Sequence, residues 1–158
     1  MTDKKIVITY GTFDLFHVGH VRLLKRLKAL GDKLVVGISS DQFNEIKGKT
    51  SFFSYEERAE IVSACKYVDE VFPEHHWEQK MDDIKKYKAN IFAMGDDWQG
   101  KFDFLQENCK VIYLPRTENI STTKIKKTLS AIHRSELEKV ESSLHDIIAI
   151  VKAMAPQN

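Results

Sequence analysis

The sequence has little cysteine and no long hydrophobic run, and each shortage excludes a class of protein. Its two cysteines, Cys65 and Cys109, fit reduced thiols of the cytosol better than a secreted disulfide framework. No apolar run approaches a membrane-spanning length, and the run after Lys5 is too short for a signal peptide. Internal repeats and low-complexity tracts are absent as well. We therefore expect a cytoplasmic protein with no membrane insertion.

Net charge is nearly absent too. The chain has 24 lysines and arginines against 23 aspartates and glutamates, which gives a formal charge of +1. Such a balance creates no overall field that would attract nucleic acid or a membrane surface, so we expect no nucleic-acid partner. Affinity for anions must instead come from local clusters, for which the candidates are Lys47, Lys49, Arg116 and Lys124.

Short β-rich runs alternate with helical segments through the first 129 residues. We expect strands at 5–10, 34–39, 70–72, 91–94 and 111–114, and helices at 18–30, 54–66 and 78–87. Gly31 is expected to end the first helix, and Ser54 with Glu57 forms a capping-box pattern at the start of the second. This alternation predicts an α/β fold with a doubly wound, Rossmann-like parallel sheet and helices on both faces.

The tail beyond residue 129 has a different pattern, in which apolar residues are spaced alternately three and four apart. We expect a C-terminal helical extension over residues 130–158, next to a domain at 1–129. The apolar stripe is short for an autonomous coiled coil, so packing on its own domain and pairing between chains both remain open. We call the heptad stripe the six residues Leu137, Val140, Leu144, Ile147, Val151 and Met154.

The most informative segment is the run YGTFDLFHVGH at residues 10–20, which directly follows a β-branched stretch. A strand that breaks at a glycine and restarts as a helix leaves backbone N–H groups and a positive dipole end facing one point, where phosphate binds well. His17 and His20 share one face of the helix start, so both imidazoles can donate to one polyphosphate while Gly19 lets an oxygen approach the main chain. Metal binding by the pair is the alternative, but no cysteine or carboxylate stands in a spacing typical of a closed zinc site.

Two further polar segments follow later strands of the predicted sheet. Gly95-Asp96-Asp97 follows the fourth strand, and Arg116-Thr117 follows the last. Each is compatible with an ordinary turn, but ligands of a doubly wound sheet gather outside the carboxyl ends of the strands. Their shared position therefore favours a common site.

These motifs make the chain resemble the HxGH nucleotidyltransferases, and specifically the branch of the cytidylyltransferase family that acts on glycerol phosphate. The resemblance runs from Ile6 to about Leu129. It implies transfer of CMP from CTP to sn-glycerol 3-phosphate, which gives CDP-glycerol and pyrophosphate for teichoic acid or glycerol-phosphate capsule synthesis. The segments that carry it are KGK at 47–49, YEER at 55–58, YVDEV at 67–71, WEQK at 77–80, MGDDW at 94–98 and RTENISTT at 116–123.

The resemblance also assigns roles to residues. It implies a homodimer, and a divalent cation, Mg²⁺, is expected to bridge the triphosphate oxygens, with protein ligands that we do not assign. The acceptor would meet Lys47, Lys80 and Trp77, and the catalytic groups would be His17, His20, Lys49, Arg116 and Ser121. The nucleotide would contact Thr12, Phe13, His17, His20, Lys49, Asp97, Arg116, Thr117, Glu118, Ile120, Ser121, Thr122 and Thr123.

The chain departs from the family pattern at two positions. Lys66 stands where relatives carry Arg, which keeps the charge but loses a forked contact. Asn119 replaces a glycine, and asparagine is among the best substitutes if that position has a positive φ.

Two other functions stay open: a transferase for another phosphorylated alcohol or for ATP with a flavin or sugar phosphate, and a non-enzymatic module that binds a partner through the terminal helix.

Overall fold

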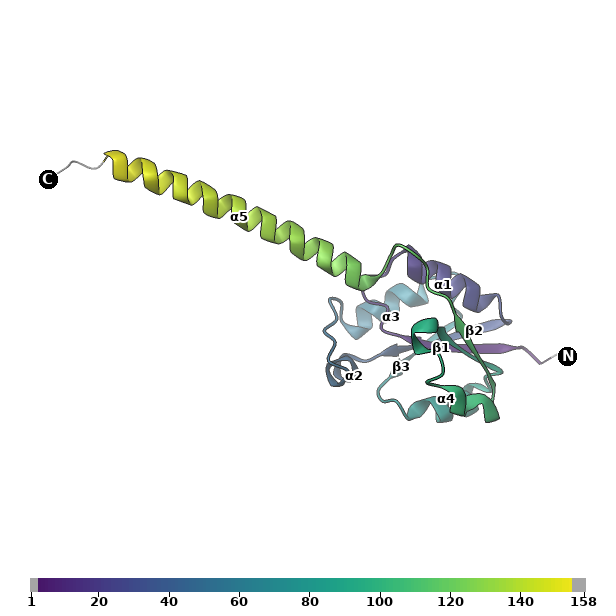
Figure 1. Ribbon diagram of the computed structural model, residues 1–158. Coiled ribbons are helices and arrows are strands. Elements are labelled where there is room, and N and C mark those ends of the chain that lie inside the picture. The colour runs from purple at the N-terminus through teal and green to yellow at the C-terminus, as the bar shows by residue number, and fades with distance from the viewer. Residues whose placement is uncertain (1–2, 155–158) are drawn as a thin grey trace. The chain divides into compact units, whose positions relative to one another are not determined.

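The computed structural model describes residues 3–154, and its centre is one parallel β-sheet. The strands stand in the order β3-β2-β1-β4-β5, so the chain moves outward from β1 first to one side and then to the other. This topology confirms the predicted doubly wound fold (Figure 1). The strands are β1 (Ile6–Gly11), β2 (Lys33–Ser39), β3 (Glu70–Glu74), β4 (Ile91–Gly95) and β5 (Lys110–Leu114).

Helices cover both faces of the sheet. On one face, Leu24 and Leu27 of α1 (Val18–Lys28) and Val62 of α3 (Tyr55–Ser63) pack in one apolar cluster. On the other face, Ile84 of α4 (Gln79–Tyr87) and Leu105 of the 3-10 helix η2 (Asp103–Glu107) pack in a second cluster. Because both faces are buried, the central strands read as nearly continuous apolar runs. Figure 1 shows α4 across the sheet from α1 and α3.

Of the two predictions about helix ends, one is confirmed and one is wrong. The predicted capping box exists: Ser54 Oγ accepts the Glu57 N–H at 3.3 Å, and Glu57 Oε2 accepts the Ser54 N–H at 2.9 Å. Gly31 does not end α1, which stops at Lys28. A Cβ at Gly31 would lie 2.5 Å from the Lys5 carbonyl oxygen, so the glycine serves a close backbone approach instead.

Two short elements were not predicted. Helix α2 (Asp41–Ile46) begins behind Ser40, whose Oγ accepts the Phe43 N–H at 3.2 Å. The 3-10 helix η1 (Asp96–Trp98) follows β4 directly. Both lie at the carboxyl ends of strands, the edge where the sequence predicts the ligand site.

The chain divides into two compact units, Met1–Ile120 and Ser121–Asn158. The described part of the second unit contains α5 (Thr122–Met154), which continues through residue 129 without a break. A division into 1–129 and 130–158 therefore stays a prediction. None of the described residues of α5 is buried, and the heptad stripe is between 54% and 79% exposed. Among the described helices, none combines the length and the apolar character needed to cross a membrane.

Candidate nucleotidyl-transfer site

The loop after β1 has a strained backbone. Phe13 and Leu15 have φ values of 54° and 48°, in the left-handed region that non-glycine residues rarely adopt. A Cβ at Gly11 would lie 2.7 Å from the ring of Phe13, which folds back over the glycine and is buried. Buried Asp14 holds the next segment in place by accepting the N–H groups of Phe52 at 2.7 Å and Phe53 at 3.0 Å. The strain is thus maintained by packing and by buried hydrogen bonds.

His17 and His20 lie together at the start of α1, as predicted. Their rings are stacked with centroids 3.9 Å apart. His17 Nδ1 accepts the Gly19 N–H at 3.0 Å, and His20 Nδ1 accepts the His17 N–H at 3.2 Å. A Cβ at Gly19 would lie 2.7 Å from His17 Cε1, so the glycine makes room for that ring. The expectation that Gly19 leaves its main chain open to an oxygen is therefore wrong, because its N–H is used inside the motif.

Both imidazoles are neutral at neutral pH. Burial lowers the pKa of His17, and it lowers the pKa of His20 to about 4, with a further decrease from His17 and partial opposition from Asp14. A neutral ring whose Nδ1 accepts a hydrogen bond carries its proton on Nε2. The two rings therefore provide Nε2–H donors that bear no net charge.

A second polar group lies where β2 and β3 end. Ser39 and Glu74 pair in register there, and Ser39 donates its O–H to Glu74 Oε2 at 3.0 Å. Glu74 Oε1 pairs with Lys80 Nζ, and Lys47 Nζ donates to Ser39 Oγ at 2.7 Å. The structure thus brings together the two lysines that the resemblance assigns to the acceptor.

Aromatic rings surround these lysines. Trp77 packs against Phe43 and Trp98, with centroids 5.1 Å and 5.4 Å away. Lys80 Nζ lies 4.8 Å from the Trp77 ring centroid, and Lys47 Nζ lies 5.6 Å from it. Trp77 is 39% exposed, so the ring both packs the loop and faces solvent. The predicted acceptor residues Lys47, Lys80 and Trp77 form one cluster.

Burial has a different effect on the charge of Lys47. It lowers the pKa of Lys47 to about 8, while Glu74 opposes the decrease and Lys49, Lys80 and Arg58 add to it. The ammonium form still dominates at neutral pH. This cluster is therefore cationic, in contrast to the histidine pair.

The loop after β5 holds several predicted nucleotide contacts, including Thr117 and Glu118. Arg116 donates to Asp97 Oδ2 at 3.0 Å, and the two side chains are 68% and 43% exposed. Asn119 has a φ of 67°, which confirms the left-handed position that the glycine replacement suggested. Ile120 Cγ2 would lie 3.0 Å from a Cβ at Gly19, so this loop reaches the histidine motif.

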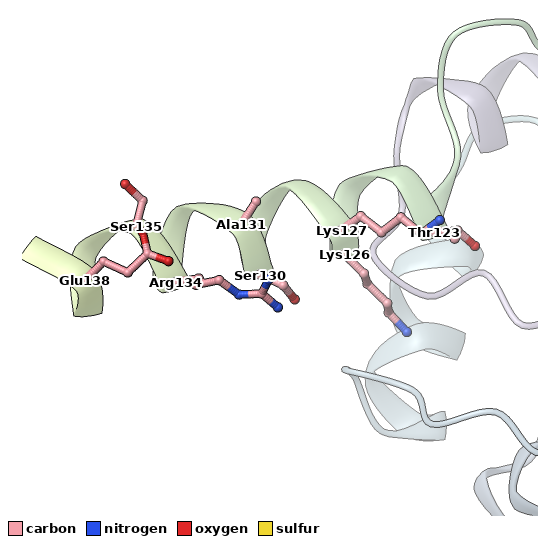
Figure 2. Close-up of a pocket in the computed structure, with 8 residues that line it drawn as sticks. All are labelled: Thr123, Lys126, Lys127, Ser130, Ala131, Arg134, Ser135 and Glu138. Carbon is pink, nitrogen blue, oxygen red and sulfur yellow. The ribbon is translucent and has the colours of Figure 1, made fainter.

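The remaining predicted residues lie apart from that loop or in the second unit. Thr12 Oγ1 donates to Asn44 Oδ1 at 3.1 Å, and Lys49 is exposed between α2 and α3. Ser121 Oγ accepts the Lys124 N–H at 3.1 Å. Ser121, Thr122 and Thr123 open the second unit, and their part in the site stays a prediction. Figure 2 shows a hollow along α5 lined by Thr123, Lys126, Lys127, Ser130, Ala131, Arg134, Ser135 and Glu138, and none of the predicted phosphate donors other than Thr123 lines it.

Sequence reasoning missed the role of Arg58. This fully buried side chain donates to the carbonyls of Thr12 at 2.8 Å, Ser39 at 2.8 Å and Phe53 at 3.1 Å. It also pairs with Asp41 Oδ1 at 2.7 Å. One guanidinium therefore joins the loop after β1 to the end of β2. Its position four residues before buried Val62 on α3 is the only signal of its burial in the sequence.

Across residues 3–154, no group of three or more histidine, cysteine, aspartate or glutamate side chains could hold a metal ion. The histidine pair thus has no third protein ligand in that range. The alternative of a closed metal site at the pair has no support there.

The family profile of the cytidylyltransferase-like proteins matches residues 8–128, and the chain therefore belongs to that family. Within it, the chain is 59% identical to the glycerol-3-phosphate cytidylyltransferase of Bacillus subtilis (strain 168), over 81% of this chain and 99% of the relative. It is 54% identical to the glycerol-3-phosphate cytidylyltransferase of Staphylococcus aureus (strain NCTC 8325 / PS 47), over 79% and 95%. These similarities confirm the resemblance found in the sequence.

A solved structure supports the fold. The crystal structure of the lipopolysaccharide core biosynthesis protein from Thermoplasma volcanium GSS1 covers 73% of this chain and 99% of its own, with a TM-score of 0.63 and 28% identity. The family match ends at residue 128, before the heptad stripe begins. The stripe is therefore a feature outside the matched region.

Proposed function

We propose that this protein transfers CMP from CTP to sn-glycerol 3-phosphate and releases pyrophosphate and CDP-glycerol. The observation that supports the proposal is that two clusters of hydrogen-bond donors suited to phosphate lie at the carboxyl edge of one sheet. One has neutral histidine donors, and the other has a cationic lysine pair lined by aromatic rings. The similarity to glycerol-3-phosphate cytidylyltransferases supports the choice of substrates.

In the proposed reaction, a phosphate oxygen of glycerol 3-phosphate attacks the α-phosphorus of CTP. The new P–O bond forms as the bond to the β-phosphate oxygen breaks, and pyrophosphate leaves with that electron pair. No covalent enzyme intermediate is needed, because positioning and charge neutralisation supply most of the catalysis in such chemistry. His17 and His20 would donate through Nε2–H to the triphosphate. The backbone N–H groups of Thr12 and Phe13, and the ammonium of Lys49, would complete this side.

The loop after β5 would hold the rest of the nucleotide. Arg116 can grip a phosphate with two parallel N–H donors, and its pairing with Asp97 already orients the guanidinium. Ser121, Thr122 and Thr123 would offer hydroxyls and a helix N-terminus to the leaving pyrophosphate. Thr117, Glu118 and Ile120 would contact the nucleotide beside them. On the acceptor side, Lys47 and Lys80 would hold the phosphate and Trp77 would form a wall.

We propose that Mg²⁺ enters as part of the substrate. The described residues offer no set of three acidic or imidazole ligands, and both oxygens of Asp14 already accept backbone N–H groups. A cation that arrives with the triphosphate would fit such a site better than one held in a dedicated protein cage. Its role would be to neutralise charge on the phosphates.

We also propose that the protein is a cytoplasmic homodimer whose product feeds a glycerol-phosphate polymer, either teichoic acid or a capsule. The heptad stripe supports pairing between chains, because six apolar side chains more than half exposed gain from mutual burial. Light scattering after gel filtration tests this with Leu144→Glu, matched by Ser142→Glu on another face of α5. We expect a dimer that only Leu144→Glu weakens, and a monomeric wild type would contradict the proposal.

The function itself is tested by pyrophosphate release. Purified protein with Mg²⁺ is assayed with CTP and ATP against glycerol 3-phosphate, phosphocholine and phosphoethanolamine. We expect release only with CTP and glycerol 3-phosphate. Release with another pair would keep the chemistry and replace the substrate, and no release with any pair would overturn the proposed activity.

A further inference from the structure

The lysine cluster contains a buried carboxylate to which neither the sequence nor the resemblance assigns a role. Glu74 is 2% exposed, and its neighbours Ser39 and Lys80 are 0% and 1% exposed. An ionised carboxylate at such depth needs partners for both oxygens. Oε1 pairs with Lys80, and Oε2 accepts the Ser39 O–H. Both oxygens of Glu74 are therefore engaged inside the protein, and its burial keeps the carboxylate out of direct contact with solvent.

The two bonds of Glu74 reach both lysines. A serine hydroxyl has one proton to donate, and the carboxylate of Glu74 fixes its direction. The lone pairs of Ser39 Oγ then face the other way and accept from Lys47 Nζ at 2.7 Å. Lys80 is held directly, and Lys47 is held through Ser39. A single negative charge thus orients two ammonium groups.

Among the groups joined by the contacts of Glu74, ammonium groups outnumber carboxylates. Two ammonium groups face one carboxylate, and the nearby guanidinium of Arg58 already pairs with Asp41. The remaining contacts of the lysines are aromatic faces: Lys47 Nζ lies 4.4 Å from the Phe43 centroid, and Lys80 Nζ lies 4.6 Å from that of Tyr10. An added anion would complete this balance.

We propose that Glu74 is a positioning residue for the acceptor. It holds Lys80 directly and Lys47 through Ser39, so that both ammonium groups converge on one phosphate monoester. The inference rests on the proposed function for the identity of that monoester. It assigns Glu74 no contact with the substrate.

The main test is Glu74→Gln, which preserves the side-chain volume and removes the charge. We expect KM for glycerol 3-phosphate to rise about tenfold or more, because two charge-assisted contacts lose their geometry. KM for CTP should stay unchanged. In the wild type, kcat/KM for glycerol 3-phosphate should fall as the pH rises through the Lys47 pKa of about 8. In Glu74→Gln, this fall should occur at a lower pH. The sign follows from what remains without Glu74: burial and the charges of Lys49, Lys80 and Arg58 all lower the pKa of Lys47.

A matched control separates positioning from stability. Asp83 is also a buried carboxylate, and it accepts the Tyr10 O–H at 2.9 Å. Asp83→Asn should reduce stability and leave KM for glycerol 3-phosphate and the alkaline limb unchanged. If Glu74→Gln behaves in the same way, the proposal is overturned.

A second variant covers the case in which Glu74→Gln does not fold. Ser39→Ala keeps the buried ion pair between Glu74 and Lys80, and it removes the hydroxyl that links Glu74 to Lys47. The variant should have a higher KM for glycerol 3-phosphate, and its kcat/KM should begin to fall at a lower pH than in the wild type. An unchanged pH profile of kcat/KM would overturn the proposal. Calorimetric binding of inorganic phosphate to the wild type and Ser39→Ala gives a readout independent of turnover. Weaker binding by the variant supports the positioning role even if no substrate pair releases pyrophosphate, and equal binding contradicts it.

Discussion

The histidine pair and the lysine cluster answer the same physical pressure in opposite ways. Burial disfavours charge at both places. His20 is buried among the rings of Phe13, Phe16 and His17, and the opposing effect of Asp14 does not restore its pKa, so it stays neutral. Lys47 keeps its charge at neutral pH because buried Glu74 opposes the desolvation. A buried donor thus either gives up its charge or needs a counterion, and this protein uses both solutions at one edge of one sheet.

The largest expected effect comes from removing one neutral donor. His17→Ala should lower kcat by about 10² to 10³, the usual result of losing one donor to developing charge. The fold should remain, although the N-cap contributes about 1 kcal/mol of stability. Steady-state kinetics and a thermal melt measure the two effects. His76→Ala, at an exposed histidine, is the control, and turnover of His17→Ala within a few-fold of wild type would refute the phosphate role.

The role of the lysine cluster is tested by the pH dependence of kcat/KM for glycerol 3-phosphate. Lys47 is protonated below its pKa of about 8, and a phosphate monoester becomes a dianion above pH about 6. In the wild type, kcat/KM for glycerol 3-phosphate should therefore peak between these values and fall above about 8. Lys47→Met should lose tenfold to a hundredfold at the peak, and the part of the alkaline fall due to Lys47 should disappear. A variant with the wild-type profile would show that Lys47 does not hold the acceptor.

Neutrality of the histidine side has a consequence for stability in acid. The folded-state pKa of His20, about 4, lies below its ordinary value of 6.5. Its contribution is therefore fully present above pH 6.5 and is lost as the pH falls toward 4. His20→Asn should make the free energy of unfolding less steep in that window, by at most about 1.4 kcal/mol per pH unit. Urea unfolding at several pH values measures the slopes, and identical slopes would mean that His20 is not buried neutral.

The smallest effect is expected at the loop that reaches the histidine motif. Asn119→Gly should change the free energy of unfolding by only a few tenths of a kcal/mol, because both residues accept a φ of 67°. Asn119→Val should cost about 1–2 kcal/mol at the same position. Chemical denaturation compares the two variants. Equal stability of the valine variant would argue against the left-handed conformation.

Much of the fold was predictable because its signals are local. Apolar strands alternating with amphipathic helices dictate the sheet order within narrow limits. The capping box at Ser54 and the left-handed position of Asn119 rest on neighbouring residues and backbone sterics alone. Helix α2 escaped prediction because its six residues are too few for a helical period to show.

The supporting groups of the site were not predictable for a different reason. Arg58 meets Thr12, Ser39 and Phe53, segments far apart along the chain that only the folded sheet brings together. Glu74 meets Ser39 only through the register of β2 and β3. Charged residues are usually exposed, so the sequence gives no sign that Glu74 is buried and, for Arg58, only its spacing from Val62. A partner for the heptad stripe could not be predicted either, because the apolar spacing indicates a face to be covered and does not indicate what covers it.

The close fit of the His17 ring over Gly19 also constrains how the motif can evolve. The space that a side chain at position 19 would need is filled by the imidazole two residues earlier. Selection for histidine at position 17 therefore fixes glycine at position 19, even though the glycine contributes no side chain to the chemistry. In a saturation scan, position 19 should accept more residue types only in variants that carry a smaller side chain at position 17. We therefore expect the residues at these two positions to change together.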